Sequence, residues 1–168
     1  MAASLGYRFS PRFSARLTAG AILGGTLDVD DRSFDVEPGW LVTASVSRSW
    51  DLGQWFLVGT ASASASFAAT EETGVADPGT VDLIATDGRI GVLFGTTVGD
   101  RVSPYLLGRA FAGPVLWEID GEDRTGSDAH HYQVGAGASI SLPANVSAQL
   151  DVSFLGERSL SAGGAVAF

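Results

Sequence analysis

Alternation of small apolar and small polar residues over residues 54–70 is the feature that most constrains the fold. Odd positions from Trp55 to Phe67 carry apolar residues or glycine, and even positions from Thr60 to Ser66 carry hydroxyl groups. A helix would scatter those hydroxyls around its circumference, whereas a strand places all of them on one face. The passage therefore predicts a long β-strand with one apolar face and one hydroxyl-rich face.

The same period of two recurs along most of the chain. It is clear in residues 12–29, 34–50, 130–142, 145–156 and 158–168. It is less clean in 82–98 and in 102–118, where only Arg109 indicates that odd positions point inward. No stretch reaches the ~18 consecutive apolar residues that a membrane helix requires. The apolar character is thus spread over many strands.

The connections between these strands alternate between short and long. Short turns are expected near residues 51–53, 98–101 and 143–145, and longer segments rich in Asp, Glu and Gly at 28–33, 71–81 and 118–129. Bacterial outer-membrane barrels have this asymmetry, with short periplasmic turns and longer external loops. The loop lengths therefore favour a membrane barrel independently of the strand pattern.

A soluble β-sandwich or lipocalin-like barrel also alternates, but two features count against it. The polar face consists of Ser, Thr and Gly with isolated charges, whereas a solvated face normally carries many Lys and Glu. Aromatic residues also gather near strand ends, as in the two interfacial girdles of membrane barrels. Those expected near the short turns are Phe13, Trp50, Trp55, Phe94 and Phe168, and those near the long loops are Phe34, Phe67, Trp117, Tyr132 and Phe154.

We therefore predict an all-β fold: one domain, residues 1–168, forming a closed antiparallel up-and-down transmembrane β-barrel of about eight strands. The chain resembles the small eight-stranded outer-membrane β-barrel proteins of the OmpA transmembrane-domain, OmpX and opacity-protein type. Its sharpest local sign is the last strand, Ser161–Phe168, whose terminal Phe is in phase with the apolar face. The resemblance implies a Gram-negative outer membrane, contacts with its lipid and lipopolysaccharide, and recognition of the last strand by the barrel-assembly machinery.

The N-terminal segment leaves two interpretations open. Residues 1–11 are either a short periplasmic segment or the remnant of another strand, and we favour the first. The opening residues show no basic region followed by an apolar one, so they are not a signal peptide. We expect that Met1 stands where a removed signal peptide ended.

Charges on the predicted inner face are the most informative side chains. This lumen charge cluster comprises Arg16, Asp87, Arg89, Arg109 and Asp151. Arg89 and Arg109 are expected almost opposite each other, where they would repel unless a carboxylate lies between them. An eight-stranded barrel is just wide enough for side chains to fill. We therefore favour a hydrogen-bonded plug over a gate or binding site for an anionic solute.

Other candidate chemistry is weak. His130 and His131 point to opposite faces, and no further histidine exists to complete a metal or catalytic site. The acidic clusters in 28–37, 71–82 and 118–128 do not match the EF-hand spacing, and clustered surface acids are usually solvated. We expect no cofactor, no metal site and no enzymatic activity. The net charge of −9 argues against nucleic acid as a partner.

Three functions remain after these arguments. The leading hypothesis is a structural or surface-interaction protein of the outer membrane, acting through its acidic external loops. A narrow channel for small solutes is the first alternative, because the lumen is lined by small polar residues and arginines. A lipid-modifying enzyme of the outer leaflet is the second. The oligomeric state is left open.

Overall fold

The computed structural model describes residues 1–29, 32–75, 79–119, 122–127 and 130–167. The strands are β1 (Ala2–Ser10), β2 (Phe13–Ile22), β3 (Gly25–Val29), β4 (Arg32–Val36), β5 (Gly39–Leu52), β6 (Trp55–Glu72), β7 (Val81–Thr96), β8 (Val102–Ala112), β9 (Pro114–Ile119), β10 (Glu122–Ser127), β11 (Tyr132–Leu142), β12 (Val146–Gly156) and β13 (Ser159–Val166). In those ranges no helix is long and apolar enough to cross a membrane.

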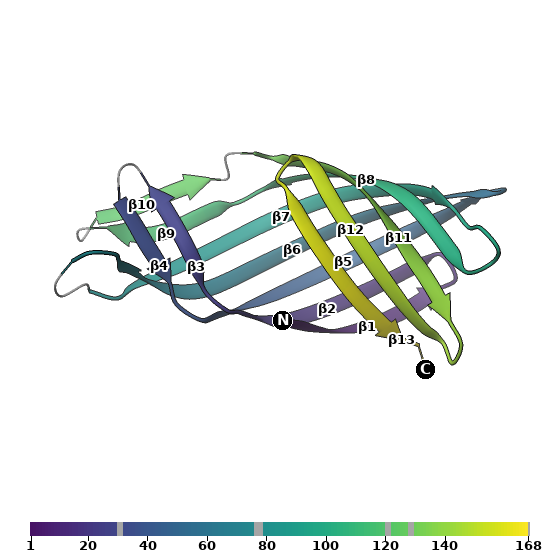
Figure 1. The fold of residues 1–168 in the computed structure, drawn as a ribbon, viewed down its shortest axis with the longest axis horizontal. Helices are drawn as coiled ribbons and strands as arrows, with labels where there is room; N and C mark the ends of the chain where they lie inside the picture. Colours follow the sequence, from purple (N-terminus) through teal and green to yellow (C-terminus); the bar gives the residue numbers. More distant parts are fainter. Residues whose placement is uncertain (30–31, 76–78, 120–121, 128–129, 168) are drawn as a thin grey trace.

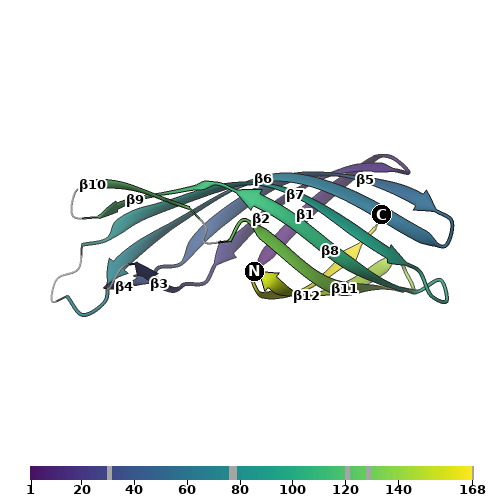
Figure 2. The ribbon, with the colours of Figure 1, turned by 90° about the horizontal axis from the view of Figure 1, so that it is seen from above.

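All strand pairs are antiparallel and belong to one curled sheet (Figures 1 and 2). The path across the sheet is β1-β2-β5-β6-β7-β8-β11-β12-β13, which is nine positions. The other four strands lie off this path. β3 pairs with β4, which also pairs with β6, and β10 pairs with β9, which also pairs with β7. They form two hairpins that lengthen the sheet at one end (Figure 1).

The sheet is open, because β1 and β13 are its two edges and do not pair with each other. The predicted closed barrel of about eight strands is therefore corrected to an open, barrel-like sheet of 13 strands. A period of two reports which way side chains point, and it carries no information about whether two distant edges meet. The predicted all-β antiparallel architecture is confirmed.

Residues Ala2–Ser10 form edge strand β1 rather than the favoured periplasmic segment. They pair with β2 from Ala2 opposite Gly20 to Arg8 opposite Ser14. The alternation of Leu5 and Tyr7 with Gly6 and Arg8 continues the two faces of β2, which explains why this segment joins the sheet. The segment is therefore a strand of this sheet.

The two ends of the sheet differ as the loop lengths predict. At one end, tight turns join β1 to β2, β5 to β6, β7 to β8 and β11 to β12; Gly53 and Gly99 there have φ of 74° and 60°, which glycine adopts without steric cost. At the other end, the segments predicted as long loops are partly folded. They contain the β3–β4 and β9–β10 hairpins, and β6 extends to Glu72.

The concave side of the sheet, which we call the inner face, carries most of the hydroxyl groups and charges together with some large apolar residues, and the convex outer face is mainly apolar. Residues opposite each other on paired strands share a face, so the register assigns each side chain. On the outer face, Ile90 and Leu106 are 65% and 62% exposed. On the inner face of the same strand as Leu106, Leu107 is 2% exposed. This division of the two faces is the one that the alternation predicts.

Candidate functional site

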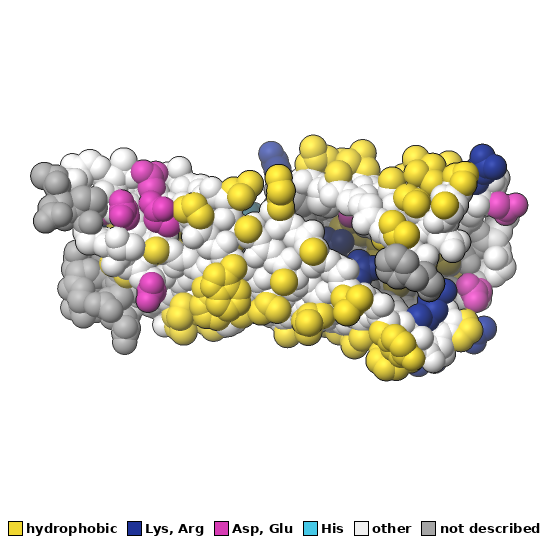
Figure 3. Space-filling view, turned by 90° about the horizontal axis from the view of Figure 1, so that it is seen from below, with side chains coloured by type: hydrophobic (Ala, Val, Ile, Leu, Met, Phe, Trp, Pro, Cys, Tyr) yellow, Lys and Arg dark blue, Asp and Glu magenta, His cyan; other side chains and the backbone are white. Residues whose placement is uncertain are grey.

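The inner face encloses a cavity of about 360 Å³ toward the short-turn end. Its walls come from seven strands, β2, β5, β6, β7, β8, β11 and β12. Its polar lining consists of Ser14, Arg16, Ser45, Ser47, Thr60, Tyr105, Arg109, Ser139 and Gln149. Seen from below, this side of the molecule is hollowed and arginine side chains are visible inside the hollow (Figure 3). The cavity therefore combines hydroxyl groups with positive charge.

All five residues of the lumen charge cluster lie on the inner face, but they do not form a single network. Arg89 and Asp87, two residues apart on β7, form an ion pair with 2.9 Å between Nη2 and Oδ2. The Arg89 guanidinium also lies over the ring of Phe111, 4.8 Å from its centroid. Asp87 and Phe111 thus hold the Arg89 side chain in place. Neither Arg89 nor Asp87 is among the residues that line the cavity.

Asp151, on β12, anchors three strands of the inner face to one another through side-chain hydrogen bonds. Its side chain is buried, and its carboxylate accepts three hydrogen bonds, from the Tyr105 hydroxyl at 2.5 Å, the Gln149 amide at 2.8 Å and the Ser161 hydroxyl at 3.3 Å. Such hydrogen bonds are stronger than neutral ones because the acceptor is charged. They join β8, β12 and β13 through their side chains, and they satisfy Asp151 without an arginine.

Arg109 and Arg16 have no carboxylate partner among the described residues. Arg109 donates to the Gln133 side-chain oxygen at 3.2 Å, and Gln133 donates to the Ser159 hydroxyl at 2.8 Å. Arg109 pairs with Gly91 on β7, whereas Arg89 pairs with Phe111. Arg89 and Arg109 therefore do not lie directly opposite each other. They occupy diagonal positions on the inner face, two residues apart along the strands.

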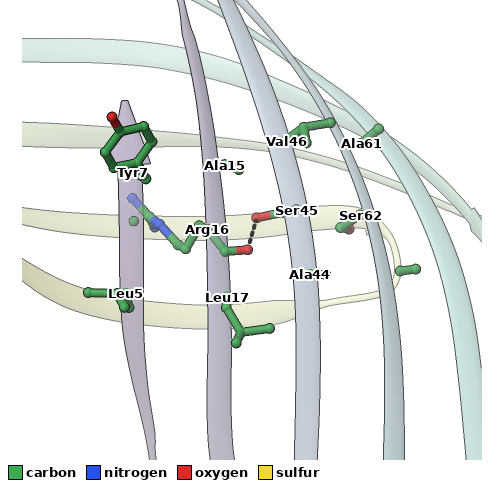
Figure 4. A pocket seen from close by; sticks show the side chains of 12 residues that line it. Leu5, Tyr7, Ala15, Arg16, Leu17, Ala44, Ser45, Val46, Ala61 and Ser62 are labelled. Atoms are coloured by element: carbon green, nitrogen blue, oxygen red, sulfur yellow. Dashed lines mark hydrogen bonds between the residues drawn. The ribbon is translucent and has the colours of Figure 1, made fainter. Parts of the chain in front are cut away.

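Arg16 lies nearest to the open edge of the sheet. Its side chain runs from β2 toward β1, with Nε 3.9 Å from the point that a Cβ on Gly6 would occupy (Figure 4). Figure 4 views the outer face of the same strands, where a shallow apolar hollow lies over small alanines, Ala15, Ala44, Ala61 and Ala63, with Leu5, Tyr7, Leu17 and Val46 around them.

A second inner cluster, at the long-loop end, was not found by sequence reasoning. Trp117, 7% exposed, contacts Phe34 edge to face at 4.4 Å between ring centroids and donates from Nε1 to Thr70 at 2.8 Å. Arg32 donates from Nε to Glu72 at 2.7 Å and lies over Phe34. Both rings are therefore buried inside this end of the sheet and do not lie on the outer face, where the membrane-interface prediction places them.

The other predicted interface aromatics that the structure describes lie in exposed or half-buried positions. Trp55 stacks on Phe94 with 5.3 Å between centroids, Phe67 stacks on Trp40 at 4.2 Å, and Trp50 lies under the Arg48 guanidinium at 5.2 Å. Phe13, Tyr132 and Phe154 are exposed. Phe168 lies outside the described residues. Stacked pairs of this kind add about 0.5–1.5 kcal/mol beyond the apolar area that they bury.

Catalytic and metal chemistry gain no geometric support. The rings of His130 and Tyr132 lie edge to face, with 6.4 Å between their centroids. Within the described ranges, no group of three or more His, Cys, Asp or Glu side chains converges as a metal site. Parts of the acidic clusters, at residues 30–31, 77, 120 and 128, lie outside those ranges.

Comparison with models of known protein families, with curated proteins and with solved structures finds no match to this chain. The functional argument therefore rests on the residues and their geometry.

Proposed function

We propose that this chain is a β-barrel of a bacterial outer membrane that acts as a structural or surface-interaction protein through its long, acidic hairpins. The observation that carries the proposal is the inverted distribution of side chains. Large apolar residues such as Ile90, Leu106 and Leu160 project outward from β7, β8 and β13, and most of the hydroxyl and charged side chains of these strands and their neighbours face inward. Water would be a poor solvent for such an exterior, whereas hydrocarbon would be a good one.

The two ends of the molecule support an orientation across the membrane. The β3–β4 and β9–β10 hairpins extend the sheet at one end, where Figure 3 shows a group of acidic side chains; at the opposite end acidic side chains lie beside arginines. The tight turns at the other end carry few residues. External hairpins and short periplasmic turns are typical of outer-membrane barrels, so the acidic hairpins are the parts available to partners.

Residence in a bilayer requires that the two sheet edges be covered, because hydrocarbon cannot hydrogen-bond their free N–H and C=O groups. Every step across the nine-position path is antiparallel, so β1 and β13 run in the same direction. We propose that they pair in parallel in the membrane and close the barrel. This closure refines the fold and leaves the two faces unchanged.

Cysteine cross-linking tests the closure directly, because the chain has no cysteine of its own. Ser4→Cys on β1 is combined in turn with Ser159→Cys, Ser161→Cys or Gly163→Cys on β13, in lipid vesicles. Ser14→Cys with Ser47→Cys is the positive control, since their hydroxyl oxygens lie 2.7 Å apart. We expect one β1–β13 combination to cross-link as fully as the control. If only the control reacts, the edges do not meet.

Heat-modifiable gel migration tests the membrane proposal itself. The chain is refolded in detergent or in vesicles, and we expect the unheated protein to migrate differently from the boiled protein and to remain with the vesicles after carbonate washing. A protein that is monodisperse without detergent and leaves the vesicles would contradict the proposal.

Replacement of the hairpins tests the surface role. In the shortened variant, residues 25–36 and 114–127 are replaced by short turns. The control variant keeps both hairpins and loses two negative charges through Asp35→Asn and Glu71→Gln, so it separates the loss of charge from the loss of the hairpins. We expect the shortened protein to insert and fold but to lose adhesion of whole cells to host or abiotic surfaces. Unchanged adhesion would exclude a role for the hairpins.

A narrow channel is the second candidate function, and the inner cavity favours it. A barrel whose lumen were completely filled would contain no such space. Planar-bilayer recording tests this function. Unit conductance that changes in Arg16→Ala or Arg109→Ala supports a channel through the cavity, and a silent bilayer excludes it.

A further inference from the structure

The inner face around the cavity carries more positive than negative charge. Between the short turns and the level of Asp87, the inner faces carry four arginines, Arg8, Arg16, Arg89 and Arg109, and two carboxylates, Asp87 and Asp151. Four positive and two negative charges leave a balance of +2. The chain as a whole has a net charge of −9. The excess is therefore local to the lumen.

Both carboxylates are engaged away from the cavity arginines. Asp87 is paired with Arg89, and Asp151 accepts its three hydrogen bonds from Tyr105, Gln149 and Ser161. Within the described chain, Arg16 and Arg109 line the cavity with no carboxylate at ion-pairing distance. Guanidinium groups form their strongest hydrogen bonds with anionic oxygens, and the described residues place no carboxylate against these two.

The remaining lining fits the missing anion. Ser14, Ser45, Ser47, Thr60 and Ser139 present hydroxyl donors around the same cavity. Guanidinium groups bind carboxylate and phosphate oxygens in a bidentate manner. A volume of about 360 Å³ holds a tetrahedral ion with several waters, each of which takes about 30 Å³.

We propose that the inner cavity is a binding site for a small free oxyanion, of the phosphate class, held between Arg16 and Arg109. The site rests on the polar inner face of the proposed barrel, but it requires neither conduction nor insertion into a bilayer. The apolar hollow in Figure 4 lies on the opposite side of the same strands. The cavity lining is largely hydroxyl and charged, which suits a hydrated ion better than the acyl chains of a lipid.

Titration with inorganic phosphate tests the site in protein refolded in non-ionic detergent and shown to be folded by its gel migration. Calorimetry is performed at constant ionic strength, with chloride as the exchanged ion. We expect saturable binding, weakened roughly tenfold or more by Arg109→Gln or by Arg16→Gln and abolished in the double variant. Arg48→Gln is the matched control, because Arg48 lies on the outer face over Trp50 and its loss is expected to change nothing.

Arg16 is exposed at the edge of the sheet, so its variant is expected to fold and carries the test even if Arg109→Gln does not. Absence of phosphate binding in the wild type would overturn the proposal, as would an equal loss in Arg48→Gln, which would indicate only surface charge. A second arm replaces phosphate with phosphatidylglycerol in the micelles. Displacement of bound phosphate by that lipid would assign the site to a lipid headgroup and overturn the free-ion proposal.

These results are distinguishable from failure of the membrane proposal. A folded protein that binds phosphate in micelles but does not enter vesicles would retain the site and lose the membrane function. A protein that inserts into vesicles but ignores phosphate would do the reverse.

Discussion

The wall formed by β8, β11 and β12 and the edge strands β1 and β13 differ in what surrounds their side chains. In the wall, Tyr105, Leu107, Gln133 and Asp151 are buried by inner-face neighbours. In β1 and β13, every described residue is exposed. The same alternating pattern occurs in both regions. The difference shows that alternation specifies faces, whereas burial depends on how far the sheet curls over itself.

The largest expected effect comes from the buried side of the wall. Leu107→Ala leaves a cavity where 2% of the residue is exposed, and we expect it to lower the free energy of unfolding by about 2–5 kcal/mol. Leu106→Ala, the neighbouring outward residue, is the matched control and is expected to cost less than about 1 kcal/mol. Urea unfolding in detergent micelles measures both. Equal losses would remove the distinction between the two faces.

A charge on the outer face comes next. Ile90 pairs with Ala61 and Ala110 near the middle of the strands, and we expect Ile90→Arg to destabilise the protein in a bilayer by about 2–4 kcal/mol. The control is Val75→Arg, at an exposed position beyond β6, which should cost nothing measurable. Reversible unfolding from vesicles gives the values. A neutral Ile90→Arg would indicate that this face is in water.

The Asp151 anchor gives a smaller effect. Tyr105→Phe removes the hydroxyl that donates to the buried carboxylate, and we expect a loss of about 1.5–3 kcal/mol, because hydrogen bonds to charged groups contribute that much. Tyr7→Phe, on the exposed edge strand, is the control and should leave stability unchanged. Chemical unfolding of the wild type and the two variants in one detergent measures these differences. Equal stability of Tyr105→Phe and wild type would contradict the anchoring role of Asp151.

The edge strand gives the smallest effect. Leu5 is exposed on β1, so we expect Leu5→Ala to change the free energy of unfolding in micelles by less than about 0.5 kcal/mol. In vesicles the same variant should lose more, since closure of the edges would bring β13 against β1. A large loss already in micelles would mean that the edge is covered there.

The sequence was sufficient for the faces of the central strands. In β6, the serines at 62, 64 and 66 lie on one face and the alanines at 61, 63 and 65 on the other. Successive side chains of a pleated strand always point to opposite faces. The five charges of the lumen cluster also share one face of the sheet. Their partners were not predictable, since the contact of Tyr105 with Asp151 joins residues 46 positions apart.

Trp117 and Phe34 were missed for different physical reasons. Trp117 has the same odd phase as Arg109, so the inward direction inferred from Arg109 would have placed it correctly. Proximity to a strand end was the weaker signal. Phe34 could not be found in this way, because the phase of the chain reverses between β4 and β5, around Glu37 and Pro38, so that Phe34 and Trp40 face opposite sides.

The openness of the sheet was the least predictable feature. Neither β1 nor β13 carries a residue whose type depends on whether its outer edge is paired. Edge pairing is a long-range property of backbone groups, and all residues except proline present those groups alike.

Fluorescence quenching by brominated lipid acyl chains tests the central claim most directly. Single cysteines at Ala61, Ser62, Ala63 and Ser64 of β6 are labelled in turn with one fluorophore and placed in vesicles containing brominated acyl chains. We predict strong quenching at Ala61 and Ala63 and weak quenching at Ser62 and Ser64. Equal quenching at all four positions, or stronger quenching at the serines, would contradict an apolar outer face in contact with lipid.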